Sequence, residues 1–210
     1  MQPPEDITVI LANGTFPTAQ HPREVLQSAT RIVCCDGAAV ACLKAGRIPD
    51  VVIGDLDSLP KETIEKLSGR IVHVAEQETN DLNKAFRYCM ERGWKDIVIL
   101  GATGKREDHT LGNISLLVDF SEKAPGISMV TDDGEFIVMR QSGSCACRAG
   151  QQISIFALEP ETHIESTGLK YPLNGLAPTR WWQATLNEAL GESFSLQFPD
   201  NHPLLIYKAF

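Results

Sequence analysis

Five short apolar runs in the first half of the chain restrict the fold more than any other feature of the sequence. They read ITVILAN, RIVCCD, DVVIGD, IVHVA and DIVILG, and segments with helical character separate them. Apolar runs of strand length that alternate with helices are typical of a parallel sheet whose strands are joined by crossover helices. The sequence therefore predicts an N-terminal α/β domain with a mostly parallel sheet.

Two helices of this domain are expected at defined positions. The clearer one lies in TNDLNKAFRYCMERG, where Thr79 or Asn80 can cap the start and Gly93 follows the end. Its apolar residues fall on one stripe: Leu82, Ala85, Phe86 and Cys89. A second helix is predicted from about Asp108 to Phe120. The residues expected to face inward are Leu111, Ile114, Leu117 and Val118.

The pattern changes to short strands and turns after about Pro125. ISMVTDDGEFIVMR is read as two strands on either side of residues 132–134, and QQISIFAL, FSLQF and PLLIYKAF follow. Ser, Lys, Pro and Gly cluster over residues 121–127. We therefore expect an α/β domain over residues 1–124 and an all-β domain over residues 125–210, a sandwich or a small barrel.

Charge and hydropathy exclude several classes of partner. The chain has 210 residues and a formal charge of -8, which disfavours a nucleic-acid backbone or an anionic membrane surface as the main partner. The start, MQPPEDITVILANG, has no basic residues and too short an apolar run for a signal peptide, and no segment has the apolar length of a membrane span. The sequence predicts a cytoplasmic protein that binds neither nucleic acid nor membrane.

The six cysteines do not form a metal-binding pattern. Only Cys145 and Cys147 make a C-x-C pair, whereas a zinc site needs two pairs with suitable spacing. Buried, reduced thiols are the expected state, and no metal is assigned to sulfur.

Polar residues follow four of the five apolar runs. In an open parallel sheet, ligands bind beyond the carboxyl ends of the strands, so these residues are candidates for one common site. A helix cap or a solvated turn would explain any one of them alone. The candidates are Asp36, Gly37, Asp55, Asp57, Gln77, Asn80, Asp81 and the segment GATGKREDH.

Asp55 and Asp57 are one residue apart, so an extended backbone would place both carboxylates on the same side. Such proximity raises the pKa of one carboxylate unless a cation is shared. Mg²⁺ binds a few carboxylates together with water and substrate phosphates, which makes it the expected ion. The alternative is a structural Asx-turn at Asp57 and Ser58, before Pro60.

The segment GATGKREDH has the features of a phosphate-binding turn. Its glycines permit close backbone approach, Lys105 and Arg106 can bind phosphate oxygens, and a helix N-terminus follows. It is not a Walker A loop, because Arg follows the lysine and the glycine spacing is too short. Beside the acidic residues it is a candidate site for a nucleoside triphosphate. His109 is either a packed or capping residue or a secondary candidate in that site.

Five blocks in order closely resemble the thiamin pyrophosphokinase family, and the resemblance covers nearly the whole chain. The blocks are CDGAAVACL, PDVVIGDLDSL, ETNDLNKAF, GATGKREDHTLGNI and STGLKYPL with the later LNEAL. Enzymes of this family move a pyrophosphoryl group from ATP to thiamin and release AMP. The resemblance implies an α/β domain, a β-sandwich, and a homodimer with active sites between subunits.

The resemblance also implies roles for individual residues. It places Asp55, Asp57 and Asp81 around Mg²⁺ and the reacting phosphates as metal ligands and catalytic groups. Nucleotide binding is expected from Asp36, Gly37, Lys84, Thr103, Gly104, Lys105, Arg106, Asp108 and His109. Lys84 is either a phosphate ligand or the partner that holds Asp81. Thiamin is expected to contact Gln77 of the neighbouring subunit, Thr167, Tyr171 and Asn187, with Tyr171 stacked on the vitamin where the family often has Trp.

The residues leave other functions open. The family pattern is altered at Lys105, where a glycine is usual, and at Leu186, where a serine is common. One alternative is a transferase that acts on another heteroaromatic alcohol, and another is a nucleotide-binding regulatory module without turnover. Trp181 and Trp182 would face opposite ways in an extended segment, so that one is core and the other covers a dimer surface or a sandwich edge.

Overall fold

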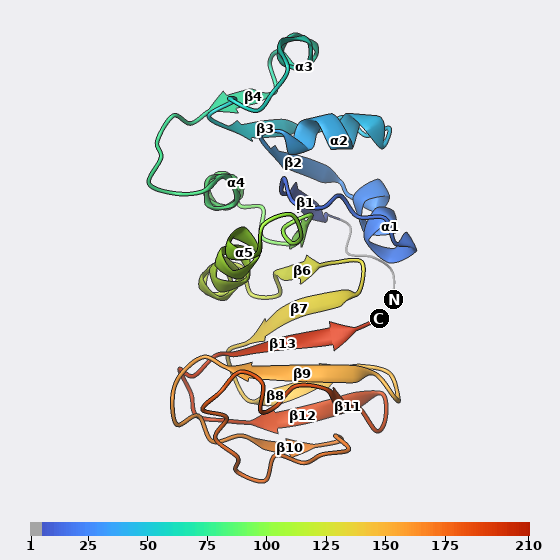
Figure 1. The fold of residues 1–210 in the computed structure, drawn as a ribbon, viewed down its shortest axis with the longest axis vertical. Helices are drawn as coiled ribbons and strands as arrows, with labels where there is room; N and C mark the ends of the chain where they lie inside the picture. The colour runs from blue at the N-terminus through green and yellow to red at the C-terminus, as the bar shows by residue number, and fades with distance from the viewer. Residues whose placement is uncertain (1–5) are drawn as a thin grey trace. The chain divides into compact units, whose positions relative to one another are not determined.

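The computed structural model describes residues 6–210. The first five residues of MQPPEDITVILANG, the segment in which no signal peptide is expected, lie outside the described residues. The chain forms two compact units, Met1–Asp132 and Asp133–Phe210 (Figure 1). No helix in the described range is long and apolar enough to cross a bilayer. The cytoplasmic location stays a prediction.

The first unit is built on a parallel sheet, as the alternation of apolar runs predicts. Its strands lie in the order β6-β5-β1-β2-β3-β4, and every neighbouring pair is parallel. The central strands are buried on both faces, which explains their continuous apolar runs. The bounds are β1 Thr8–Leu11, β2 Arg31–Cys35, β3 Val51–Gly54, β4 Ile71–His73, β5 Ile97–Leu100 and β6 Ser128–Val130.

The strand β6 places the boundary between the units later than residues 124 and 125. Both strands expected in ISMVTDDGEFIVMR are present, but β6 pairs in parallel with β5 and belongs to the first unit. All three residues of β6 are buried. A run this short has no readable period, so the sequence pattern did not separate a last parallel strand from a first antiparallel one.

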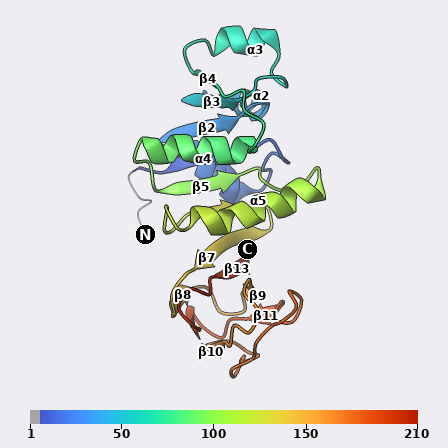
Figure 2. The ribbon, with the colours of Figure 1, turned by 90° about the vertical axis from the view of Figure 1, so that its left-hand side faces the viewer.

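Five helices lie within residues 6–132, and α4 and α5 lie on the near side of the parallel sheet in Figure 2. The stripe predicted for α4 is buried, the Asn80 side chain accepts a hydrogen bond from the Asn83 backbone N–H at 2.9 Å, and Gly93 takes φ +72° after the end. The bounds are α1 Gln20–Ser28, α2 Ala38–Lys44, α3 Lys61–Lys66, α4 Asp81–Glu91 and α5 Glu107–Phe120.

The inward face of α5 was predicted only in part. Leu117 and Phe120 are buried, but Leu111 is 58% exposed. Phe120 stacks on Phe86 of α4 with ring centroids 3.9 Å apart. The buried residues of α5 therefore lie in its C-terminal half. In its first turns the Leu111 side chain is exposed to solvent.

The second unit is all β, as predicted. One antiparallel sheet has the order β11-β9-β13-β7 and the other the order β10-β12-β8. Apolar residues from both, such as Ile155, Phe194 and Ile206, form one buried cluster. The bounds are β7 Gly134–Met139, β8 Gly143–Ala146, β9 Gln152–Ala157, β10 Glu165–Thr167, β11 Asn187–Glu188, β12 Ser193–Gln197 and β13 Leu204–Ala209.

The cysteines and the tryptophan pair had different outcomes. All six thiols are unbridged, and Cys147 alone is not fully buried, so the prediction of buried, reduced thiols is confirmed for the other five. The prediction that one of the two tryptophans lies in the core is wrong, because Trp181 is 55% and Trp182 is 74% exposed. The surface role expected for the other stays a prediction. The chain turns at these residues instead of running extended, so neither ring enters the core.

Candidate active site

A cleft of about 460 Å³ lies at the carboxyl ends of the parallel strands in the first unit. Asp36 follows β2 directly, Asp55 follows β3, and Ala102 lies just beyond β5. Parallel strands end at the same edge of a sheet, so the topology brings these residues together. The predicted site residues that line the cleft are Asp36, Asp55, Asp57, Gln77, Asp81, Lys84, Gly104, Lys105, Arg106 and His109.

Three predicted nucleotide residues of this unit do not line the cleft. A Cβ on Gly37 would lie 2.7 Å from Asn13 Nδ2, so this glycine permits close packing. The carbonyl of Thr103 accepts a hydrogen bond from the backbone of Thr15 at 2.8 Å. Asp108 accepts hydrogen bonds from Arg106 at 3.0 and 2.5 Å. Nucleotide contacts from these residues stay a prediction.

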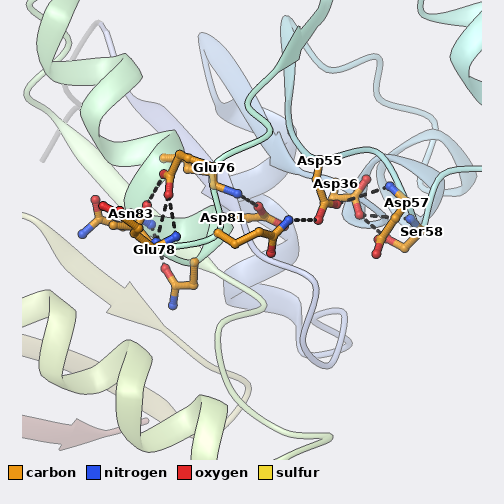
Figure 3. A network of polar contacts seen from close by, with 12 residues as sticks. Asp36, Asp55, Asp57, Ser58, Glu76, Glu78, Asp81 and Asn83 are labelled. Atoms are coloured by element: carbon orange, nitrogen blue, oxygen red, sulfur yellow. Dashed lines mark hydrogen bonds and ion pairs between the residues drawn. The ribbon is translucent and has the colours of Figure 1, made fainter.

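Asp36, Asp55 and Asp57 form the tightest acidic group of the cleft. Each offers a carboxylate oxygen, and these oxygens lie within 4.8 Å of one another (Figure 3). Asp36 is 3% exposed. Its Oδ2 accepts hydrogen bonds from the Ser58 backbone N–H and hydroxyl, but its Oδ1 is buried and has no hydrogen-bond partner among residues 6–210. A buried carboxylate oxygen without a partner is costly, which makes this atom a candidate ligand for a cation.

A turn, and not an extended strand, brings Asp55 and Asp57 together. Leu56 between them has φ +68°, in the left-handed region. The Asp57 backbone N–H donates to Asp55 Oδ1 at 3.3 Å. The expected extended geometry is therefore wrong although the expected proximity is present. The side chain that closes the turn is that of Asp55, whereas the structural alternative had assigned the turn to Asp57 and Ser58.

The pKa values within the acidic group shift in opposite directions. The charge of Asp55 is the largest cause that raises the pKa of Asp57, followed by desolvation and the charge of Asp36. A hydrogen bond from Gln77 is the largest cause that lowers the pKa of Asp55. The repulsion and the unpartnered Asp36 oxygen both fit a hard divalent cation such as Mg²⁺, which prefers carboxylate oxygens.

Asp81 lies on the same cleft but outside this tightest group. It begins α4, and Lys84 Nζ lies 3.1 Å from its Oδ1. Lys84 is 4% exposed. Burial raises the pKa of Asp81, against the opposing effect of Lys84. In the structure Lys84 therefore acts as the partner of Asp81, and Asp36 replaces Asp81 in the closest set of carboxylates.

The opposite side of the cleft is formed by two loops that contact each other. Lys105 has φ +62°, and its Nζ donates to the Asn13 backbone carbonyl at 2.8 Å. Gly104 has φ +74°, and a Cβ there would lie 2.1 Å from Thr15 Oγ1, so only glycine fits. Lys105 in the structure thus holds the loop after β1 against the loop after β5.

Three asparagines line the cleft, Asn13, Asn80 and Asn113, and the sequence analysis missed Asn13 and Asn113. Asn113 Nδ2 donates to the Ala102 carbonyl at 2.8 Å, and Asn80 Nδ2 donates to Asn113 Oδ1 at 3.1 Å. Asn80 was expected both as a helix cap and as a strand-end candidate for the site. Asn13 follows the first apolar run directly, so the rule that identified the aspartates at strand ends also applies to it.

The predicted substrate residues of the second unit are not gathered in one cavity. Thr167 lines a separate cavity of about 450 Å³, and Tyr171 is 60% exposed. Asn187 is buried, and its amide is used on the backbone: Oδ1 accepts from the N–H groups of Tyr171 at 3.1 Å and Glu188 at 2.8 Å, and Nδ2 donates to the Tyr171 carbonyl at 2.7 Å. The Asn187 side chain therefore holds the backbone of Tyr171 in place.

Two family models match the two units of the chain. The model described as thiamin pyrophosphokinase, catalytic domain, matches residues 22–130, which is more than half of the chain. The model described as thiamin pyrophosphokinase, substrate-binding domain, matches residues 134–207. The chain belongs to the thiamin pyrophosphokinase family.

Relatives and solved structures of thiamin pyrophosphokinases agree with this assignment. The chain is 34% identical over 147 residues to thiamine pyrophosphokinase of Bacillus subtilis, covering 66% of this chain and 68% of that protein. It is 29% identical over 160 residues to thiamin pyrophosphokinase 1 of Caenorhabditis elegans, covering 69% of this chain and 65% of that protein. The matched segments thus span about two thirds of these relatives.

The fold is that of thiamin pyrophosphokinase structures. The crystal structure of the Bacillus subtilis protein superposes with a TM-score of 0.83 at 24% identity, covering 97% of this chain and 99% of that one. The Candida albicans protein gives a TM-score of 0.80 at 16% identity, covering 100% of this chain and 95% of that one. At these identities the structures support the fold alone.

Proposed function

We propose that the chain transfers a pyrophosphoryl group from ATP to the hydroxyl of thiamin, giving thiamin diphosphate and AMP, with Mg²⁺ as the metal. One observation carries the proposal. A single cleft places the acidic group Asp36, Asp55 and Asp57 together with Lys84, Lys105 and Arg106. Such a cleft suits a polyphosphate accompanied by a divalent cation, because cationic side chains bind phosphate oxygens and carboxylates bind the metal.

The chain's own residues are assigned roles by their position. The thiamin hydroxyl oxygen bonds to the β-phosphorus of ATP, the bond from that phosphorus to the bridging oxygen breaks, and AMP leaves with that oxygen. A carboxylate of the cleft accepts the hydroxyl proton, and Asp57 and Asp81 remain the two candidates. Arg106 and Lys105 orient the phosphates, because such transfers depend chiefly on alignment and charge neutralisation.

Asp36, Asp55 and Asp57 would hold Mg²⁺, with Asp81 beside them. When bound, the ion supplies neutralisation of the phosphate charge. The buried Oδ1 of Asp36 supports this assignment, because no protein group satisfies it within the described residues. In this proposal the α/β unit binds nucleotide and metal.

The second unit is proposed to contribute to the thiamin pocket and to a homodimer interface. Thiamin is a cation, and the exposed Tyr171 ring offers a face for cation–π contact. Several large apolar side chains near it in sequence are also exposed, as expected for a surface that a second copy covers: Trp181, Trp182, Leu186 and Leu190. Gln77 is assigned to thiamin recognition from the partner subunit.

The test is incubation of the protein with ATP, Mg²⁺ and thiamin, followed by separation of the nucleotides. AMP and thiamin diphosphate in equal amounts are expected. ADP would indicate simple phosphorylation, and unchanged ATP would indicate a nucleotide-binding module. AMP release that depends on a different heteroaromatic alcohol, and not on thiamin, would change the substrate but not the reaction.

A further inference from the structure

The loop between β4 and α4 is held by one carboxylate that the site description does not use. Glu76 accepts hydrogen bonds from the Glu78 backbone N–H at 2.8 Å, the Thr79 backbone N–H at 3.0 Å and the Thr79 hydroxyl at 2.5 Å. Arg87 of α4 adds an ion pair at 3.0 Å. Figure 3 shows these bonds converging on the Glu76 carboxylate.

These bonds fix both sides of Gln77. The residue before it supplies the carboxylate, and the two residues after it supply the donors, so Gln77 lies at the tip of a closed turn. Arg87 attaches that turn to the first unit through α4. The Thr79 hydroxyl is the largest of the causes that hold the pKa of Glu76 at about 2, so the carboxylate is charged at neutral pH.

Gln77 in turn contacts the acidic group. Its Nε2 donates to Asp55 Oδ2 at 2.9 Å. This bond restricts the rotation of the Asp55 carboxylate and leaves Oδ1 directed toward the Asp57 turn. The contacts thus run from Glu76 through Gln77 to Asp55.

We propose that Glu76 is a positioning residue: it clamps the loop so that Gln77 holds the Asp55 carboxylate in place for a divalent cation. The proposal rests on the proposed function for the identity of the site. It assigns Glu76 no contact with substrate or metal. Outer-shell partners of this kind orient metal ligands and change metal affinity when they are removed.

The experiment measures Mn²⁺ binding to the whole chain by electron paramagnetic resonance, with Mn²⁺ as the probe for the Mg²⁺ site. Glu76→Gln keeps the side-chain shape and removes the charge, and its dissociation constant for Mn²⁺ is expected to rise about tenfold. Glu78→Gln is the matched control, because it removes the same charge from the same loop. The Glu78 side chain is exposed and lies outside the hydrogen-bond network in the described chain, so its binding should stay within about twofold of the wild type.

A double-mutant cycle separates positioning from general loss of structure. If Glu76 acts through Gln77, then Glu76→Gln causes no further loss of Mn²⁺ binding in a Gln77→Ala background. Additive losses, or equal losses in Glu76→Gln and Glu78→Gln, would overturn the proposal. Hydrogen exchange of the Glu78 and Thr79 amides should accelerate in Glu76→Gln alone.

If Glu76→Gln does not fold, Arg87→Gln tests the same clamp by removing the ion pair that attaches the turn to α4. The Mn²⁺ affinity should then fall about threefold, because the pair is partly exposed. A wild-type chain that binds Mn²⁺ but forms no AMP from ATP and thiamin would refute the proposed function and leave the clamp intact. A wild-type chain that binds no Mn²⁺ would overturn the clamp.

Discussion

The two units differ in how they use the residues that the family resemblance assigns to them. In the α/β unit, side chains distant in sequence meet in one cleft, and some of them are buried there, as Asp36 and Lys84 are. In the β unit, Tyr171 is 60% exposed, Thr167 lines a separate polar cavity, and Asn187 is turned inward. The first unit therefore gathers its assigned residues in one cleft, whereas the second unit leaves its assigned residues apart.

Sheet topology explains the difference. Parallel strands all end at the same edge, so the residue after each strand reaches a common site without special loops. Neighbouring antiparallel strands end at opposite edges, so residues after successive strands are separated. In the second unit, a residue near a ligand must therefore be held by local contacts. The two hydrogen bonds between the Asn187 side chain and the Tyr171 backbone are such contacts.

The largest expected effect is on turnover, from a change in the built cleft. Asp57→Asn should lower kcat by about 10³-fold, because one preorganised charge is removed from the reacting centre. The free energy of unfolding without Mg²⁺ should not fall. The charges of Asp55 and Asp36, which raise the pKa of Asp57, no longer face a third negative charge in the variant. Thermal unfolding without metal and AMP formation with it provide the measurements. Asp119→Asn on α5 is the exposed control, and a large drop in melting temperature for Asp57→Asn would contradict the assignment.

The next effect is on stability, and it depends on pH. Lys84→Met removes the buried partner of Asp81 and should cost about 2 kcal/mol at pH 7, less than a fully buried pair because Asp81 is partly exposed. Burial already raises the pKa of Asp81, and loss of Lys84 raises it further. A raised carboxyl pKa gives stability that is lost as pH rises, so the difference from the wild type should shrink near pH 4. Urea unfolding at pH 7 and pH 4 measures the free energy of unfolding, with Lys66→Met as the control. A difference between Lys84→Met and the wild type that is the same at both pH values would exclude this ion pair as the cause.

The fold was largely predictable from the sequence, because parallel strands that are buried on both faces consist of continuous apolar runs. The strand-end rule brought out Asp36, Asp55 and Asp57, although not the geometry that joins the last two. A left-handed Leu56 has no signal in the sequence, since leucine rarely adopts that conformation. Side-chain partners also left no pattern: nothing in EQETND, residues 76–81, distinguishes Glu76, which holds the loop, from Glu78, which is exposed.

A third prediction addresses the surface of the second unit. Tyr171→Ala should raise the KM for thiamin about tenfold and the KM for ATP less than twofold, because loss of a cation–π face costs about 1 kcal/mol or more. Tyr171→Phe keeps the ring and should behave as the wild type. Asn187→Ala should change the same constant in the same direction, since it frees the Tyr171 backbone. Equal increases in both KM values would refute a stacking role.

The smallest effect on the folded chain is expected at Trp182, the most exposed large apolar residue among residues 6–210. Trp182→Ser should change the free energy of unfolding of the monomer by less than about 0.5 kcal/mol, because an exposed ring loses few contacts. If a second copy covers this surface, the same change should shift the sedimentation equilibrium toward monomer, because large aromatic residues at interface centres contribute most of the binding energy. An unchanged dimer would place the interface elsewhere. A chain that sediments as a monomer in the wild type and still converts thiamin would show that turnover needs no second copy of the chain.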